Sequence, residues 1–411
     1  MSTAFREVVG YAIGGGWGTE KEQPESASVG YVIRGTDIPR VAVGDTSTVP
    51  RRFHKASNLT SRILEPDDIV FEVSGGSKDQ PVGRALQVTE NVLAKFDERV
   101  MCASFCKLIR INREKAEPGY IFRLLQAAYT GGQLDTYQVQ STGITNFKWK
   151  PFLEHFDVNL PERHVQRQVA AVLDAFDDLI ENNRRRIELL EETARAIYRE
   201  WFVNYRYPGH ADVPLVDSAL GPIPEGWRAA TIGDALELKY GKALKASARR
   251  GGGVAVVSSA GVVGWHDESF VDGPAIVVGR KGNVGSVHWV DGPCWPIDTA
   301  YFVQTDLPLR FVSEQLRRTA FTNSHAAVPG LSREAAYAHP FLLPDVKVLD
   351  SFQSLVDPLG SHATGLMLQN EKLAEVRDLL LPKLVTGQID VPSRDHDAVI
   401  STGSTESSSV A

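Results

Sequence analysis

Polar side chains that can read the edges of nucleic-acid bases gather in two parts of this sequence, residues 1–155 and 206–348. Arginine and lysine can pair with guanine, asparagine and glutamine can pair with adenine, and serine, threonine and apolar groups can contact the other edges. The first part offers Arg51, Arg52, Lys55, Asn58, Lys78, Gln138, Gln140, Thr145, Asn146 and Lys148, and the second offers Lys239, Lys242, Lys245, Arg249, Arg250, Arg280, Lys281, Asn283, Asn323 and Arg333. Each alone is better explained as surface decoration, and for the clusters base contact and surface decoration are equally open.

Motifs for catalysis are absent from the same sequence. No GxxxxGK[ST] loop occurs, which excludes a P-loop motor, and no Asn/Asp-Pro-Pro-aromatic motif of an adenine methyltransferase is present. Asp67 and Glu72 could suggest a nuclease pair, but Ser74 stands where such sites carry lysine, so we interpret the segment as a turn entering a strand. We therefore expect no catalytic residue.

Cofactor and metal sites are not indicated either. The glycine runs at residues 14–18 and 251–253 could cradle a phosphate only if each opened a helix, and neither is followed by helical periodicity. Three cysteines form no CxxC pair, and ten histidines show no metal-ligand spacing. We expect buried, reduced cysteines and no cofactor or metal bound by this chain.

Length and charge set further bounds. A chain of 411 residues can hold two domains, each with its own core. It has no run of about 20 apolar residues, so we expect a soluble, cytoplasmic protein. The net charge of -7 is concentrated in two stretches: residues 151–205 carry 7 basic and 11 acidic side chains, and residues 346–411 carry 5 and 9. The charge of the whole chain therefore does not exclude phosphate binding by the remaining parts.

A long helix is predicted between the two polar parts, over residues 162–204. Apolar residues there recur at alternating spacings of three and four, which is typical of a coiled-coil seam interrupted at polar Asn183. At 1.5 Å per residue this helix would be about 60 Å long. One apolar stripe cannot bury itself, so a partner helix is required.

The partner is predicted in the same chain, over residues 351–385. A shift of 183 positions, which brings Leu190 onto Leu373, superposes the apolar positions of the two stretches. The chain therefore looks like two copies of one unit, a globular domain followed by a long helix. The predicted seam consists of Val169, Val172, Phe176, Leu179, Ile187, Leu190, Ile197, Trp201, Phe352, Val356, Leu359, Leu366, Leu373, Leu380 and Leu384.

The remaining elements predict mixed α/β domains. We expect strands near residues 31–33, 69–73, 104–111, 254–258, 275–278, 286–290 and 301–304, with helices near 120–129 and 312–321. The predicted organisation is a first domain at 1–155, a helix at 156–205, a second domain at 206–348, a helix at 349–391 and a disordered tail at 392–411.

Four motifs resemble the specificity subunits of type I restriction-modification enzymes. VQRQVAAVLDAFDDLIENNRRRIELLEETARAIYREWF (residues 165–202) resembles their central conserved helix, and NEKLAEVRDLLLPKLVTGQIDV (370–391) resembles their distal helix. GPIPEGW (221–227) resembles the start of a target recognition domain, and GPAIVVGRKGNVGSV (273–287) resembles a strand and glycine turn inside one. The resemblance covers about residues 5–391.

This resemblance implies an α+β protein with two target recognition domains separated by two long antiparallel coiled-coil helices. It implies a noncatalytic subunit that reads an asymmetric, bipartite sequence in double-stranded DNA. The partners would be two modification subunits, which use S-adenosylmethionine, and two restriction subunits, which use ATP and Mg. Residues such as Tyr198, Arg199 and Phe202 are candidates for partner docking, although they could equally complete the helix packing.

Two departures from the family pattern leave alternatives open. The first domain begins without a Pro-x-Gly-Trp start and carries VSGGSKDQPVG (73–83) where the second carries GRKGNVG, so its edge could be completed by another part of the chain or by a partner.

The alternative functions are a coiled-coil adaptor without DNA binding and the specificity subunit of a solitary methyltransferase system.

Overall fold

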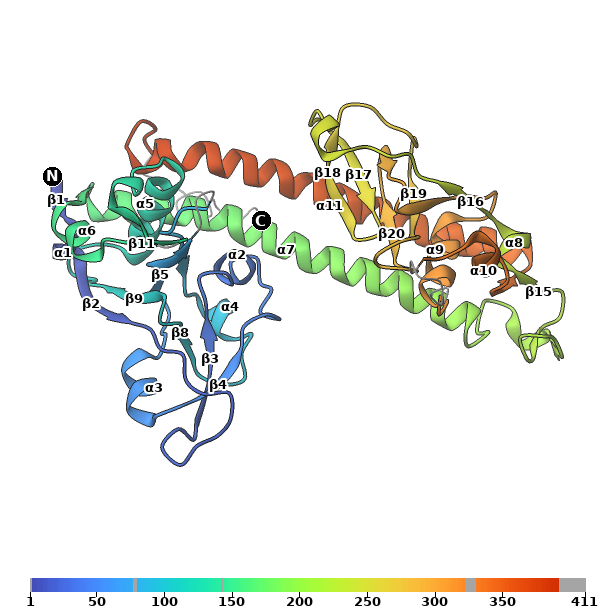
Figure 1. Cartoon of the computed structure of the whole chain (residues 1–411), viewed down its shortest axis with the longest axis horizontal. Helices are drawn as coiled ribbons and strands as arrows, with labels where there is room; N and C mark the ends of the chain where they lie inside the picture. Colours follow the sequence, from blue (N-terminus) through green and yellow to red (C-terminus); the bar gives the residue numbers. More distant parts are fainter. Residues whose placement is uncertain (1, 77–79, 142, 322–329, 392–411) are drawn as a thin grey trace, which may run out of the picture. The chain divides into compact units, whose positions relative to one another are not determined.

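The computed structural model describes residues 2–76, 80–141, 143–321 and 330–391 (Figure 1). The chain divides into two units: residues 1–182 with the segment that begins at 370, and residues 183–369. Each unit combines small sheets with short helices and half of each long helix. The tail predicted at residues 392–411 lies outside the described residues.

The first unit contains a four-stranded sheet in the order β2-β9-β5-β7 and a three-stranded sheet in the order β4-β3-β8. All neighbouring strands are antiparallel except β3 and β8, which run parallel. The strands are β1 (Ser2–Ala4), β2 (Val9–Gly14), β3 (Ser28–Ile33), β4 (Arg51–His54), β5 (Ile69–Glu72), β6 (Ser74–Gly76), β7 (Ala85–Gln87), β8 (Val100–Cys102), β9 (Cys106–Ile111), β10 (Gln138–Ser141), β11 (Ile144–Phe147) and β12 (Asp157–Asn159).

The second unit repeats this arrangement with a four-stranded sheet, β16-β22-β19-β20, and a three-stranded sheet, β18-β17-β21, in which β17 and β21 run parallel. Its strands are β13 (Leu215–Val216), β14 (Ile223–Pro224), β15 (Arg228–Thr231), β16 (Glu237–Tyr240), β17 (Val254–Ser258), β18 (Gly261–His266), β19 (Ala275–Gly279), β20 (Val287–Val290), β21 (Cys294–Pro296), β22 (Ala300–Gln304) and β23 (Pro340–Leu343). The same strand order in both units confirms the predicted internal repeat.

Short helices complete each domain. In the first unit they are α1 (Phe5–Val8), α2 (Ile38–Val41), α3 (Ala56–Arg62), α4 (Glu90–Leu93), α5 (Pro118–Thr130) and α6 (Trp149–His155), with the 3₁₀ turn η1 (Asp135–Tyr137). In the second they are α8 (Ile232–Ala235), α9 (Leu309–Arg317) and α10 (Arg333–Tyr337), with η2 (His210–Asp212) and η3 (Ala246–Ala248). The predicted strands and both predicted helices are present, with bounds shifted by a few residues.

The edge of the first domain is completed by the chain itself. Strand β1 pairs with β12, as β15 pairs with β23 in the second unit. The first domain therefore starts with a strand equivalent to the one that follows GPIPEGW, although it has no such motif. The core of this domain also receives Leu381, Leu384 and Val385 from a distant part of the chain.

The long helices are α7 (Arg163–Phe202) and α11 (Val346–Val385). Helix α11 begins and ends earlier than the predicted 349–391, for local reasons. The Asp345 carboxylate accepts a hydrogen bond from the backbone N–H of Lys347, which caps the start. Gly387, with a φ of 72°, ends the helix in the left-handed conformation that favours glycine.

Inside each unit the two helix halves run antiparallel. In the first unit Arg377 pairs with Asp177, and the Asn370 side chain donates to the carbonyl of Ile180. In the second unit the Asn183 amide donates to Gln369 over 3.3 Å. As the residue number increases along α7, the number of the contacted residue on α11 decreases. The predicted antiparallel pairing is therefore confirmed within each unit.

Residues related by the predicted shift play the same structural part in both cores. Val169 and Leu173 of α7 are buried in the first unit, and their counterparts Phe352 and Val356 of α11 are buried in the second. Reciprocally, Leu381 and Val385 of α11 lie in the first core, and Tyr198 and Phe202 of α7 lie in the second. Each domain therefore packs on the start of one helix and the end of the other.

Most of the predicted seam faces the helix partner or a core. Val169, Phe352, Val356, Leu366 and Leu384 are buried, and Val172, Phe176, Ile187, Leu190, Ile197, Trp201, Leu359, Leu373 and Leu380 are partly buried. The prediction is wrong at Leu179, which is 39% exposed, while the neighbouring Ile180 is 3% exposed. A helix of 3.6 residues per turn drifts against a 3.5-residue seam, and here the apolar contact has moved by one position.

Two predicted absences can be compared with the described residues. Within the described ranges, no helix is long and apolar enough to cross a membrane, and no group of three His, Cys, Asp or Glu side chains is arranged to hold a metal. Cys102, Cys106 and Cys294 are free and buried. Burial raises the pKa of Cys102 to about 12, so this thiol stays protonated and unreactive.

Candidate nucleic-acid interface

Two predicted contact residues of the second unit, Arg280 and Arg333, are brought to one surface around Tyr240. The Arg280 and Arg333 guanidinium groups lie 4.9 and 4.8 Å from the centre of the Tyr240 ring. This ring is 46% exposed, although tyrosine usually buries much of its apolar surface. The result is an exposed aromatic ring flanked by two cations.

The strand register explains why these residues meet. Tyr240 ends β16 and pairs with Tyr301 of β22, whose other neighbour is the end of β19. Arg280 follows β19 directly, and its backbone N–H donates to the carbonyl of Thr299. The carbonyl of Arg280 accepts from the N–H of Leu331, which brings the start of α10 and hence Arg333 beside it.

The electrostatics of this cluster favour an anion. Two guanidinium groups near one ring repel each other, and neither forms an ion pair with a carboxylate in the part of the chain that the structure describes. Arg280 donates to the carbonyl of Asp298 over 3.0 Å. Burial raises the pKa of Tyr301 beneath the cluster to about 12, so it remains neutral. A phosphate or the acceptor edge of a base would offset this positive charge.

Other candidates in the second unit are neutralised or spread out. Lys239 pairs with Glu237, and Arg250 pairs with both Asp267 and Glu268. Arg249 donates to the carbonyl of Val263. Lys242, with its ammonium 5.4 Å from the Trp295 ring, is exposed, as are Lys245, Lys281 and Asn283. Asn323 lies outside the described residues.

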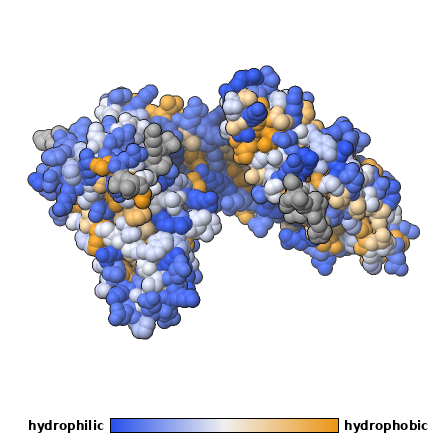
Figure 2. All heavy atoms as spheres, viewed as in Figure 1, coloured by the Kyte–Doolittle hydropathy of each residue, from blue (hydrophilic) through white to orange (hydrophobic). Residues whose placement is uncertain are grey.

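The candidates on β4 and α3 of the first unit are largely paired with acidic groups. Arg51 lies 3.8 Å from Glu98, Arg52 lies 3.2 Å from Glu20, and Lys55 lies 2.6 Å from Glu25. The fourth candidate here, Asn58, accepts a hydrogen bond from Arg62 over 3.3 Å. This edge of the first domain is hydrophilic in Figure 2 around β4 and α3, but its charges are mutually compensated.

A second group in the first unit lies on the sheet β10-β11-β6. Asn146 of β11 pairs with Ser74 of β6, so the segment that replaces GRKGNVG joins the predicted polar loop. Gln140, Asn146 and Lys148 are exposed. Gln138 is partly buried and accepts from the backbone of Val82. The group also included Thr145, which is 5% exposed and is poorly placed to reach a ligand, and Lys78, which lies outside the described residues.

Several further assignments are clarified by the structure. The Glu72 carboxylate is 2% exposed and forms a two-pronged ion pair with Arg84, so the suggested nuclease pair is a structural salt bridge next to a turn at Asp67. For Tyr198 and Phe202 the structure favours the packing alternative over partner docking, because both lie in the second core at 4% and 3% exposure.

One aromatic contact was missed from the sequence. The Trp17 ring is 39% exposed and lies 4.9 Å from the Arg52 guanidinium. Its signal was the aromatic residue inside the glycine run at 14–18, a combination that places a flat side chain on an otherwise bare loop.

The comparisons with known proteins find that this chain is similar to specificity subunits of type I restriction enzymes. No protein-family model matches the chain. The MjaIX specificity subunit of Methanocaldococcus jannaschii is 25% identical over 275 residues, which cover 58% of this chain and 62% of that protein. The HindI specificity subunit of Haemophilus influenzae is 19% identical over 415 residues, which cover 80% and 88%.

A solved structure shows the same fold. The crystal structure of the type I restriction-modification system S subunit from M. genitalium superposes with a TM-score of 0.55 at 14% identity, over 93% of this chain and 95% of that one. The matched region spans less than two thirds of the M. jannaschii relative. The resemblance predicted from the helix motifs is thus confirmed, as is the two-domain fold with long helices.

Proposed function

We propose that this chain is the DNA sequence-recognition subunit of a type I restriction-modification complex and that it reads an asymmetric, bipartite target. The observation that carries the proposal is the duplication of one fold with unlike polar surfaces. Two domains of equal strand order present Tyr240, Arg280 and Arg333 in one case and the β10-β11-β6 surface in the other. Equal scaffolds with different side chains suit two half-sites of different sequence.

The long helices are proposed to set the distance between the half-sites. Helices α7 and α11 each contain 40 residues, which corresponds to about 60 Å at 1.5 Å per residue. B-DNA turns once per about 34 Å, so a stiff spacer fixes both the separation and the rotational phase of two contacts. Inserting four residues near Arg185 should lengthen the gap in the target and leave both half-sequences unchanged.

Catalysis is proposed to reside in partner subunits. By the resemblance, two modification subunits would supply S-adenosylmethionine chemistry, and two restriction subunits would supply ATP- and Mg-dependent cleavage. The chain would determine which DNA sequence the complex acts on, without catalytic residues or a bound cofactor of its own. In this scheme its place is the cytoplasm, where the host DNA lies.

An adaptor without DNA binding is favoured by one specific observation. On strand β18 the apolar residues Val262, Val263 and Trp265 are 53%, 38% and 52% exposed. Figure 2 shows hydrophobic surface in this β17–β18 region of the second unit. Such a patch suits contact with another protein. A recognition subunit also needs protein partners, so the patch is compatible with both functions, and DNA binding separates them.

The test is DNA binding by the chain together with its modification subunit, at stated salt concentrations. Arg280→Ala with Arg333→Ala should weaken binding about tenfold or more and reduce the slope of log affinity against log salt by about 1 to 2. Arg317→Ala is the control, because that exposed arginine pairs with Glu314 and lies on α9. Specific DNA binding that is equal in all three proteins would remove the cluster from the interface, and no binding by the wild type would favour the adaptor.

A further inference from the structure

The contact between the second domain and α11 contains an arginine held in an unusual position. The guanidinium of Arg310, at the start of α9, lies 4.6 Å from the centre of the Trp289 ring of β20. Its other side lies on α11, because a Cβ added to Gly360 would stand 1.7 Å from Nη2 and 1.9 Å from Cζ. The side chain is therefore sandwiched between an indole ring and bare helix backbone.

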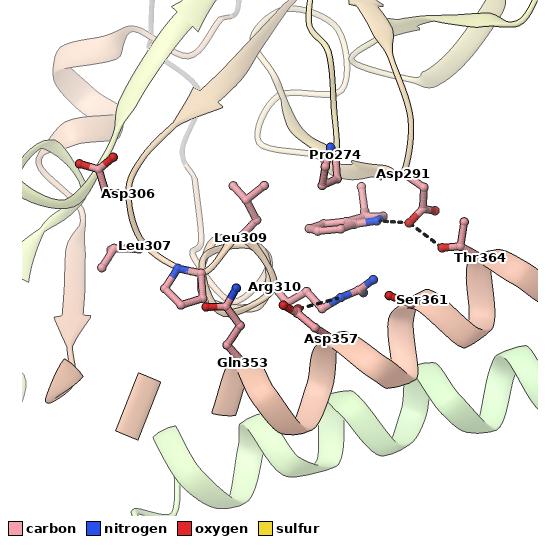
Figure 3. Close-up of a pocket in the computed structure, with 12 residues that line it drawn as sticks. Pro274, Asp291, Asp306, Leu307, Leu309, Arg310, Gln353, Asp357, Ser361 and Thr364 are labelled. Atoms are coloured by element: carbon pink, nitrogen blue, oxygen red, sulfur yellow. Dashed lines mark hydrogen bonds and ion pairs between the residues drawn. The ribbon is translucent and has the colours of Figure 1, made fainter. Parts of the chain in front are cut away.

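Polar contacts fix both faces of this sandwich (Figure 3). The indole N–H of Trp289 donates to the Asp291 carboxylate over 2.8 Å, and the same oxygen accepts from the Thr364 hydroxyl over 2.9 Å. On the helix side, Arg310 Nε lies 3.7 Å from Asp357. Asp357, Gly360 and Thr364 are spaced by three and four positions and so occupy one face of α11.

Arg310, held between Trp289 and Gly360, forms an arginine clamp. This clamp connects α11 to the sheet that presents the candidate cluster. Trp289 belongs to β20, which pairs with β19, and Arg280 follows β19 directly. A pocket of about 530 Å³ lies beside the clamp, so this edge of the contact is packed less closely than the core around Phe311, Phe352 and Val356. Together with the hydrogen bond from Thr364 to Asp291, the stacked arginine is a directional contact on this side, since a planar guanidinium tolerates little rotation between two flat surfaces.

We propose that Arg310 is a positioning residue that sets the orientation of the second domain on α11 and thereby the spacing at which its half-site is accepted. This inference rests on the proposed function. Arg310 itself would touch no DNA. Gly360 is required because any side chain at this position would expel the guanidinium from its place against the helix.

Two glycines of α11 provide a matched pair of variants. Gly360→Ala introduces a methyl group into the Arg310 guanidinium, whereas Gly365→Ala introduces one with no atom within 4 Å. Both replacements raise helix propensity by a similar amount. Gly365→Ala should therefore raise the melting midpoint by about 2 °C, and Gly360→Ala should lower it.

The functional readout is the accepted spacing in the target. Each variant is co-expressed with the modification subunit, and methylation is compared at plasmid sites that carry the native gap and the gap changed by one base pair. With Gly360→Ala, discrimination between these gaps should fall at least threefold, with both half-sequences unchanged, and Gly365→Ala should behave as the wild type. Arg310→Lys keeps the charge but loses the planar stack, so it should resemble Gly360→Ala.

The outcomes separate the two proposals. Wild-type discrimination in both Gly360→Ala and Arg310→Lys would overturn the positioning role while leaving the proposed function intact. Absence of any methylation or DNA binding with the wild-type chain would overturn the proposed function and this inference with it. Faster hydrogen exchange in β20 and α9 for Gly360→Ala, but not for Gly365→Ala, is expected independently of DNA, and equal exchange in both would show that no clamp exists.

Discussion

The two units attach a domain to a long helix through different contacts. In the first, Arg123 of α5 is 3% exposed and reaches both Asp174 and Asp177 of α7 over 2.6 Å. In the second, Arg310 of α9 lies against α11 near Asp357, with a side chain that is 25% exposed. An arginine performs the attachment in both units, but one is enclosed between carboxylates and the other is stacked on a ring.

A comparison of α5 with α9 shows that the two attaching arginines occupy different positions on equivalent helices. Tyr120 and Phe311 are both fully enclosed, and they contact Val385 and Phe202, residues related by the repeat. Aligning Tyr120 with Phe311 places Gly119 opposite Arg310, so the two arginines come from successive turns of equivalent helices.

The long helices α7 and α11 also differ at the positions that contact these arginines. Asp174 and Asp357 are related by the repeat, but Asp177 corresponds to Gly360. Where one helix carries a second carboxylate, the other carries no side chain and leaves room for a flat group. Duplication has therefore conserved the attachment while its chemistry diverged, and the comparison predicts unequal consequences of breaking it.

The largest expected effect is the loss of Arg123. Replacing it by methionine leaves Asp174 without its cation and leaves Asp177 with Arg377 alone, and burial already raises the pKa of Asp174 despite the arginine. We expect Arg123→Met to destabilise the first unit by about 3 kcal/mol and Arg310→Met to destabilise the second by about 1 kcal/mol, because the latter is more exposed. Urea denaturation with hydrogen exchange on each unit checks this, and equal losses would contradict the distinction.

The next effect concerns the two candidate surfaces. Tyr240→Ala removes the ring between two unpaired guanidinium groups, so DNA affinity should fall about tenfold. Arg52→Ala in the first unit should change affinity less than about twofold, because Glu20 already neutralises this arginine. Fluorescence anisotropy at one salt concentration measures both, and a larger loss with Arg52→Ala would reverse the ranking.

A smaller effect is expected from two buried histidines at equivalent strand ends. Burial lowers the pKa of His54 in β4 from its usual value of 6.5. When the pH falls below 6.5, the folded state therefore binds fewer protons than the unfolded state. Stability should therefore fall as the pH drops below 6.5, and His54→Gln should flatten that decline. His266 of β18 lies 3.3 Å from Asp267 and serves as control through His266→Gln. Urea denaturation at pH 7.5 and 5.5 compares them, and an unchanged slope in His54→Gln would refute the assignment.

The smallest effect lies in the helix seam of the second unit. Asn183 is 1% exposed in the helix seam and bonds to Gln369. Asn183→Leu should raise stability by about 0.5 to 1 kcal/mol but weaken the register that one polar pair specifies. Asn182→Leu, at the adjacent exposed position, should change stability by less than half as much. Thermal denaturation distinguishes them, and a loss of stability in Asn183→Leu would contradict this role.

Sequence periodicity was sufficient for the long helices and the repeat because these depend on local spacing. It related Val169 to Phe352 through the repeat and located strands in both domains, but it misplaced the contact at Leu179 because the seam drifts along a real helix. It left open whether Tyr198 and Phe202 dock a partner or complete the helix packing, since their burial depends on a domain that folds back onto the helix end.

The candidate site was predictable only in part. Arg280 and Arg333 were selected by residue type, but their meeting over Tyr240 follows from strand register and a backbone bond to Leu331. The neutralisation of Arg250 by Asp267 and Glu268 follows from the pairing of β17 with β18, which brings the residues before β17 beside those after β18. Such pairings depend on tertiary geometry, so residue type alone overestimated the number of available cations.

The most direct test of the account is a methylation map of a domain exchange. Residues 1–155 are replaced by the corresponding segment of a related specificity subunit, and the chimera is expressed with the modification subunit. The account predicts that one half of the methylated motif changes, while the other half and the gap are retained. A change in both halves, or a single continuous motif in the wild type, would contradict two independent recognition domains on a common spacer.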